Sequence, residues 1–165
     1  MRTGTLNSGN NQMKIDGKIT KPLDNEEVNH LETIEALFFA YRDFVSDPDR
    51  ILSQYKLGRA HHRVLYFANR YPGMTVAEML EILQITKQSL ARVLKQLIET
   101  DLIVQSEGEV DRRKRLLYPT EKGRELVLAL SNPQSRRISG ALSNLDAIET
   151  KAVNKFLKSM GVGPL

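Results

Sequence analysis

The stretch VAEMLEILQITKQSLARVLKQLIET, residues 76–100, constrains the fold most strongly, because it predicts two helices separated by only a short turn. Thr75 precedes the first helix and Glu78 follows three residues later, which is the pattern of a capping box. Thr86 precedes the second helix as its expected N-cap. Apolar residues recur on one face of this second helix and polar residues on the other. Two helices joined so closely are typical of a helix-turn-helix.

The residues that follow predict a two-stranded hairpin with a basic tip. Segments 102–107 and 115–118 read as antiparallel strands, and the loop between them carries Asp111, Arg112 and Arg113. A helix-turn-helix followed by such a hairpin is a winged helix-turn-helix, so we expect a mainly α fold with a small β-hairpin wing. A solvated charged loop is the alternative interpretation of the basic run.

The chain outside this lobe divides into a tail and flanking helices. Residues 1–24 are rich in glycine, asparagine, threonine and lysine without a sustained period, and we expect a flexible tail. Asn25 is the expected cap of a first helix that Pro48 should end, and Asn132-Pro133 should break or kink a later helix. We expect a tail over residues 1–24 and a domain over residues 25–160. Within the domain, the winged lobe should cover about 59–120, and the flanking dimerisation helices about 25–47 and 121–160.

The flanking helices have wide apolar faces that the winged lobe does not need. The first helix repeats apolar residues at three- and four-residue spacing, among them Phe38 and Tyr41. The last helix, which Asp146 should begin, carries Phe156 and Leu157. Helices this apolar usually pack on two sides, so we expect a homodimer in which a twofold-related mate covers the exposed faces.

Composition excludes several classes of function. The 165 residues include no cysteine, so disulfides, thiolate metal sites and cysteine redox switches are ruled out. No apolar run of about 18 residues could span a membrane, and no apolar N-terminal segment is typical of a signal peptide, which favours a cytoplasmic protein. Neither a Walker-type loop nor a serine nucleophile elbow is present, so we expect no enzyme. The net charge of +4 is modest, so its placement matters more than its size.

The second helix of the pair is a candidate DNA-reading helix. A helix fits the major groove and reads base edges with side chains near its N-terminus, where unpaired backbone N–H groups also attract phosphate. Glutamine can pair with adenine and arginine with guanine. The candidate contacts are Thr86, Lys87, Gln88, Ser89 and Arg92. A solvated amphipathic helix without a ligand is the alternative.

The predicted wing would contact the flanking DNA groove. Arg112 and Arg113 alternate in direction on a hairpin, and arginine gains from the negative potential of a narrow minor groove. Asp111 would repel phosphate, so we expect its carboxylate to hold Arg113 in one orientation. The alternative is that Asp111 only offsets local charge.

These segments together resemble a MarR-type transcriptional regulator over roughly residues 28–160. The most specific part is the D-x-R wing motif at Asp111 and Arg113, followed by TEKGREL at residues 120–126. The resemblance implies a homodimer that binds double-stranded DNA, with gene control that a small ligand often relieves. Three positions depart from the family. Glycine is usual where Asp101 stands, so the helix C-cap must be made in another way. Pro119 replaces the usual leucine or similar residue, and Pro133 interrupts what is commonly one long dimer helix.

The resemblance also places an effector pocket near the segment LGRAHHRVLYF. Tyr41, Arg59, His62 and Tyr66 are the candidates to contact an anionic aromatic ligand there, and a core or dimer-interface role is the alternative for each. No cofactor is expected. His61 and His62 point about 100° apart on a helix and cannot chelate one metal together in the usual way. Ordinary partly buried histidines are favoured over a zinc-type site shared with another helix.

Two functions from different classes remain. The first is a dimeric, sequence-specific DNA-binding regulator on an inverted repeat, and the alternative is a winged-helix protein-interaction module without DNA readout. A basic wing beside an arginine-bearing helix favours the first, because an interaction module more often exposes an apolar patch.

Replacement of Arg113 by alanine is expected to weaken binding to all DNA sequences alike, because a phosphate contact carries no base information. The slope of log binding constant against log salt concentration should fall by about 1. Titrations of the parental chain and the variant at several salt concentrations measure both slopes, and equal slopes would contradict the wing contact.

Overall fold

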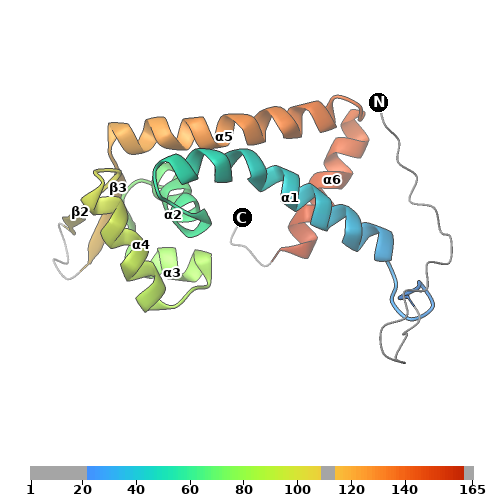
Figure 1. Cartoon of the computed structure of the whole chain (residues 1–165), viewed down its shortest axis with the longest axis horizontal. Coiled ribbons are helices and arrows are strands. Elements are labelled where there is room, and N and C mark those ends of the chain that lie inside the picture. The colour runs from blue at the N-terminus through green and yellow to red at the C-terminus, as the bar shows by residue number, and fades with distance from the viewer. Residues whose placement is uncertain (1–21, 109–113, 162–165) are drawn as a thin grey trace. The chain divides into compact units, whose positions relative to one another are not determined.

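The computed structural model describes residues 22–108 and 114–161 (Figure 1). The chain divides into two units, residues 1–39 and 40–165, and helix α1, Leu31–Gln54, begins in the first unit and ends in the second. In the first unit, the side-chain oxygen of Asn25 accepts a hydrogen bond from the backbone N–H of Leu31 at 3.3 Å. His30, with φ of 66°, turns the chain just before the helix. The sequence suggested that the helix begins directly after Asn25, but it begins after this turn, at Leu31.

The second unit holds a helix-turn-helix and a small sheet. Its elements after α1 are α2 (Arg59–Arg70), β1 (Met74–Thr75), α3 (Val76–Leu83), α4 (Lys87–Glu99), β2 (Ile103–Glu107), β3 (Arg115–Pro119), α5 (Glu121–Leu142) and α6 (Ala147–Met160). The sheet is antiparallel with strand order β1-β3-β2. The expected fold class, a winged helix-turn-helix with terminal helices, is confirmed. Sequence patterns missed β1, which has only two residues.

Side-chain caps fix where the helices of this unit begin. Thr75 and Glu78 form the predicted capping box, in which the Glu78 carboxylate accepts the N–H of Thr75 at 2.7 Å. The hydroxyl oxygen of Thr86 accepts the N–H of Ser89 at 3.2 Å. The hydroxyl oxygen of Thr120 accepts the N–H of Gly123 at 2.9 Å. The three predicted threonine caps are thus present, because a cap depends only on residues within one helical turn.

The two internal prolines do not end their helices. Pro48 lies inside α1, which continues to Gln54, and Pro133 lies inside α5, which continues to Leu142. The expectation that Pro48 ends a helix was wrong, and Pro133, which was expected to break or kink a helix, does not break α5. Each proline removes one backbone hydrogen bond from a long ladder. The ring of Pro48 is fully buried, so its packing offsets that loss.

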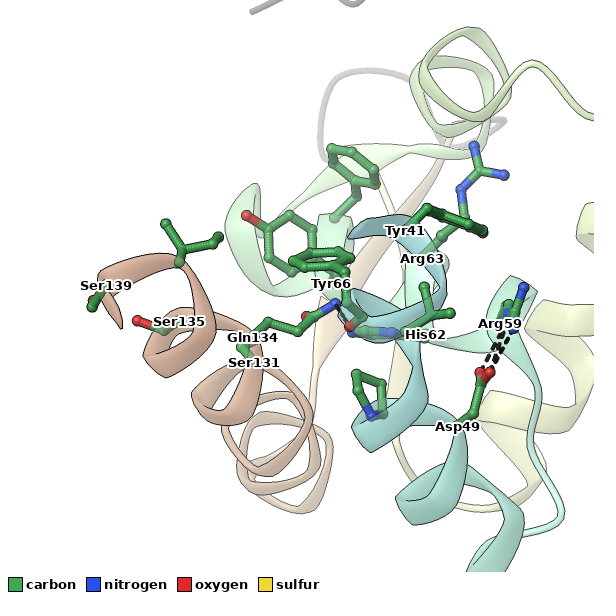
Figure 2. A pocket seen from close by; sticks show the side chains of 15 residues that line it. Tyr41, Asp49, Arg59, His62, Arg63, Tyr66, Ser131, Gln134, Ser135 and Ser139 are labelled. Carbon is green, nitrogen blue, oxygen red and sulfur yellow. Dashed lines mark hydrogen bonds and ion pairs between the residues drawn. The ribbon is translucent and has the colours of Figure 1, made fainter. Parts of the chain in front are cut away.

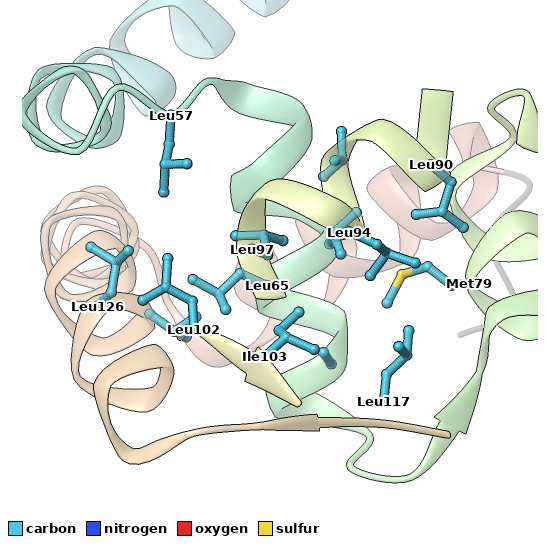
Figure 3. Close-up of a cluster of buried hydrophobic side chains, with 14 of the residues drawn as sticks. Leu57, Leu65, Met79, Leu90, Leu94, Leu97, Leu102, Ile103, Leu117 and Leu126 are labelled. Atoms are coloured by element: carbon cyan, nitrogen blue, oxygen red, sulfur yellow. The ribbon is translucent and has the colours of Figure 1, made fainter. Parts of the chain in front are cut away.

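The core joins α2, α4, the sheet and α5 (Figure 3). Leucine dominates it, and the figure shows side chains from helices and strands converging on one volume. The fully buried side chains include Leu65, Met79, Leu90, Leu97, Leu102, Ile103, Leu117 and Leu130. None of the helices that the structure describes is long and apolar enough to cross a membrane.

The end of α4 is fixed against the start of α5. Asp101 takes the left-handed conformation, with φ of 57°, and the N–H of Leu102 donates to the carbonyl of Leu97 at 2.8 Å. This is a Schellman cap, so Asp101 replaces the usual glycine within the same geometry and no other cap is needed. The hydroxyl of Thr120 donates to the carbonyl of Asp101 at 2.8 Å. A Cβ on Gly123 would overlap the carbonyl oxygen of Leu102.

We expect Gly123→Ala to lower the free energy of unfolding by about 2 kcal/mol or more, because the added methyl meets backbone that cannot rotate away. Gly140 is the matched control, since it lies in the same helix and a Cβ there would meet nothing within 4 Å. Gly140→Ala should raise the free energy of unfolding by roughly 0.5–1 kcal/mol through helix propensity. Urea unfolding measures both, and equal effects would contradict the close approach.

Candidate nucleic-acid interface and an apolar cavity

The N-terminal turns of α4 present the five residues that the sequence singled out. Leu90, at the centre of this segment, is fully buried, whereas all five candidates are exposed. Thr86 and Ser89 are occupied by the cap, in which the Thr86 hydroxyl also donates to the Ser89 hydroxyl at 2.9 Å. Among the described residues, Lys87, Gln88 and Arg92 have no hydrogen-bond or ion-pair partner. Three long donors therefore stand free on one exposed surface.

A groove runs beside this surface, between the start of α3, helix α4 and the wing strands. Its volume is 880 Å³, and Lys87, Lys95, Lys114 and Arg115 contribute to its wall. Arg115 is held by Glu107 at 2.9 Å, and Lys95 approaches Glu99 at 3.8 Å. Both pairs are exposed, so they neutralise the cations only weakly in water.

Glu78 is the acidic side chain in the wall of this groove. Its pKa is lowered, first by the hydrogen bond from the Thr75 backbone and further by the Thr75 hydroxyl and the charge of Lys114. The carboxylate is therefore committed to capping α3. Its position explains how an acidic residue can lie in an otherwise cationic groove.

The sequence-based selection missed Lys95, Lys114 and Arg115 in the groove wall. For Lys95 the signal was available, because Lys87 and Lys95 are eight residues apart and occupy one helix face with a small alanine between them. Lys114 and Arg115 required the strand pairing, in which Arg115 lies opposite Glu107. Asp111, Arg112 and Arg113 lie outside the described residues, so their predicted roles stay predictions.

A cavity of 460 Å³ lies within the second unit, between α1, α2 and α5 (Figure 2). Tyr41, Arg59, His62 and Tyr66, the four predicted pocket residues, all line it. The sequence missed the α5 wall, where Ser131 belongs to a run of serines spaced by four residues. That spacing places small polar side chains on one helix face and was the available signal.

The charged groups at the cavity are paired. The Arg59 guanidinium donates to both carboxylate oxygens of Asp49, at 2.7 to 3.1 Å, and this raises the pKa of Arg59. Figure 2 draws this contact as dashed lines. The guanidinium also lies 5.6 Å from the centre of the Tyr41 ring. Burial lowers the pKa of His62, while the charge of Asp49 acts in the opposite direction.

His61 and His62 lie on different sides of α2 and make different contacts. A nitrogen of His61 lies 2.8 Å from the Gln96 side-chain oxygen, and the other accepts the N–H of Gly58 at 3.1 Å. His61 thus ties α2 to α4, whereas His62 faces the cavity. Within residues 22–108 and 114–161, no group of three or more histidine, aspartate or glutamate side chains is arranged to hold a metal ion.

Comparison with known sequences identifies relatives of this chain. The sequence pattern of the MarR family matches residues 55–114. The HTH-type transcriptional regulator PetP of Rhodobacter capsulatus is 52% identical over 108 residues, which cover 66% of this chain. The matched region spans 65% of the length of that regulator.

Solved structures share the fold. A MarR family transcriptional regulator from Listeria monocytogenes, complexed with 26-mer DNA, superposes with a TM-score of 0.66 at 20% identity and covers 77% of this chain and 85% of its own. The transcriptional repressor CouR, bound to a 23-mer DNA duplex, gives a TM-score of 0.64 at 22% identity, with coverages of 85% and 99%. At these identities the likeness establishes the fold.

We expect His62→Gln to reduce the loss of stability toward acid. Because the pKa of His62 is lowered in the folded chain, the unfolded chain binds more protons as the pH falls. The resulting penalty is absent well above the ordinary pKa of 6.5 and grows as the pH falls below it. Urea unfolding between about pH 7 and pH 5 should show a smaller loss for the variant than for the parental chain. Parallel curves would contradict the buried neutral histidine.

Proposed function

The chain belongs to the MarR family, and we propose that it is a sequence-specific DNA-binding transcriptional regulator that acts as a homodimer. One observation carries the proposal: the free Lys87, Gln88 and Arg92 side chains stand at a helix N-terminus that borders a cationic groove. The DNA complexes of two proteins with this fold support it. We also propose that the protein acts in the cytoplasm.

In the proposed complex, α4 enters the major groove. Gln88 and Arg92 read base edges, while Lys87 and Lys95 contact phosphate on the groove wall. Thr86 and Ser89 hold the first turn, so that its backbone N–H groups can face a phosphate. The wing, with Lys114 at the edge of its described part, follows the adjacent backbone. Arg112 and Arg113 would extend this contact, with Asp111 as the orienting carboxylate.

Exposed apolar side chains on α1 and α6 support the proposed dimer. In α1, Phe38 is 69% exposed and Tyr41 57%. In α6, Ile148 is 79% exposed and no residue of the helix is buried. Apolar surface of this extent usually marks an interface, and a twofold mate would cover the same faces on both chains. Two winged lobes then read two half-sites of an inverted repeat.

We also propose that the cavity between α1, α2 and α5 holds a small effector. Its volume lies within the usual range for ligand sites, about 300–1,000 Å³. Tyr41, Arg59, His62 and Tyr66 are the proposed contacts. Since α2 carries three of them and also packs on α4, a ligand has a direct structural path to the DNA-reading helix.

Selection of binding sites from a random duplex pool, at near-physiological salt, tests the DNA proposal. We expect enrichment of an inverted repeat, because two identical lobes read two half-sites. Salt-sensitive binding without an enriched motif would contradict sequence reading. Complete absence of binding would favour the alternative, a winged-helix protein-interaction module.

Variants then assign the base contacts. Gln88→Ala and Arg92→Ala should each relax the preference at one or two positions of the half-site, at a cost of about 1–3 kcal/mol for the preferred base. Lys151→Ala, which removes a positive charge from α6 and not from the groove, is the control and should keep the parental preference. Unchanged preference in both α4 variants would place base reading elsewhere.

A further inference from the structure

We propose that the cavity selects uncharged, mainly apolar ring compounds that carry one hydrogen-bond acceptor, and that it discriminates against carboxylates. This inference rests on the proposed effector role of the cavity, and it names the class of ligand. From the sequence we expected an anionic aromatic ligand, because the resemblance places an effector pocket at the segment that carries Arg59 and His62. The contacts of Arg59, Arg63 and His62 favour a neutral ligand instead.

Arg59 is already paired where an incoming anion would meet it. Its guanidinium already makes three hydrogen bonds to the two oxygens of Asp49, the shortest at 2.7 Å. Asp49 lines the same cavity, so an incoming anion would meet a carboxylate beside the guanidinium. A ligand carboxylate would have to displace Asp49 and would then leave that carboxylate without its partner. The contact is bidentate but exposed to solvent, with 54% of the Arg59 side chain and 36% of the Asp49 side chain accessible, so it fixes the guanidinium more than it cancels the charge.

Arg63 contributes its aliphatic part to the cavity and directs its charge elsewhere. A terminal nitrogen of its guanidinium donates to the carbonyl oxygen of Leu83, at 3.1 Å. Leu83 ends α3 and does not line the cavity. The charged group is therefore engaged at the turn of the helix-turn-helix, while the methylene chain of Arg63 adds apolar wall.

His62 is the remaining basic group, and its surroundings favour the neutral imidazole. Burial disfavours its charged form, and the one acidic group that acts on it, Asp49, is already paired with Arg59. The donors left in the wall are neutral hydroxyls and an amide. An anion in this cavity would lose its hydration without gaining a free cation, which is unfavourable.

Ser131 supplies the polar feature that a neutral ligand would use. Its hydroxyl oxygen is buried and has no hydrogen-bond partner. Within the described residues, no other buried side-chain oxygen or nitrogen lacks a partner. Ser131 lines the cavity from α5. The walls around it are mainly apolar, with Phe44, Val45 and Ile138 among them. A ring with a carbonyl or ether oxygen would fill the apolar space and accept the Ser131 hydrogen bond.

Three probes with one ring system test this proposal: naphthalene, naphthalene-1-carboxamide and naphthalene-1-carboxylate. Calorimetric titration of the full chain at pH 7.5 should show that the carboxamide binds on the order of tenfold or more tightly than the carboxylate. Equal or tighter binding of the carboxylate would overturn the inference and leave the effector cavity standing. Failure of all three probes to bind would overturn the cavity as a ligand site, and with it the inference.

Two variants separate the causes. Asp49→Asn frees Arg59, so the carboxylate should gain on the order of tenfold in affinity while naphthalene binding stays near the parental value. Ser131→Ala removes the donor, so the carboxamide should lose about three- to tenfold and naphthalene should be unchanged. Melting of each variant without ligand checks that it is folded. A carboxylate affinity unaltered by Asp49→Asn, or a carboxamide affinity unaltered by Ser131→Ala, would contradict the assigned role of that residue.

Discussion

The position of helix α4 depends on one close approach, between the carbonyl of Leu102 and the backbone at Gly123. Leu102 follows α4 directly, and its carbonyl accepts the N–H of Thr120, at 3.2 Å, where β3 ends and α5 begins. Only a residue without a Cβ allows α5 to start so near this carbonyl. The end of α4, the exit of the sheet and the first turn of α5 therefore meet at a single point.

Helix α2 connects the other side of α4 to the cavity. One of its faces carries Arg59, His62 and Tyr66 in the cavity wall, while His61 contacts Gln96 of α4 at 2.8 Å. Arg63 reaches the last residue of α3. Any rotation of α2 that accommodates a ligand would thus act on both helices of the helix-turn-helix at once.

Sequence patterns predicted the features that are local. The threonine caps and the amphipathic face of α4 need only neighbours within one or two turns, and the structure contains them. The prolines were misjudged because the fate of a helix at Pro48 depends on whether its ring is buried by distant residues. Asp101 was misjudged for a similar reason, since the left-handed conformation costs aspartate less than most residues and the Thr120 contact helps to hold it.

The charged residues of the sequence do not reveal which of them are paired in the folded chain. The sequence shows Arg59 and Arg63 in one segment but not their acceptors. Asp49 lies ten residues before Arg59, on another helix, and the carbonyl of Leu83 lies twenty residues after Arg63. Only the packing of α1 and α3 against α2 brings these acceptors to the arginines. On α4 the reverse holds, because Lys87, Gln88 and Arg92 are not met by any acceptor in the described part of the chain. A modest net charge of +4 can therefore be distributed unevenly, with Arg59 paired at the cavity and Lys87 and Arg92 unpaired, within the described residues, at the start of α4.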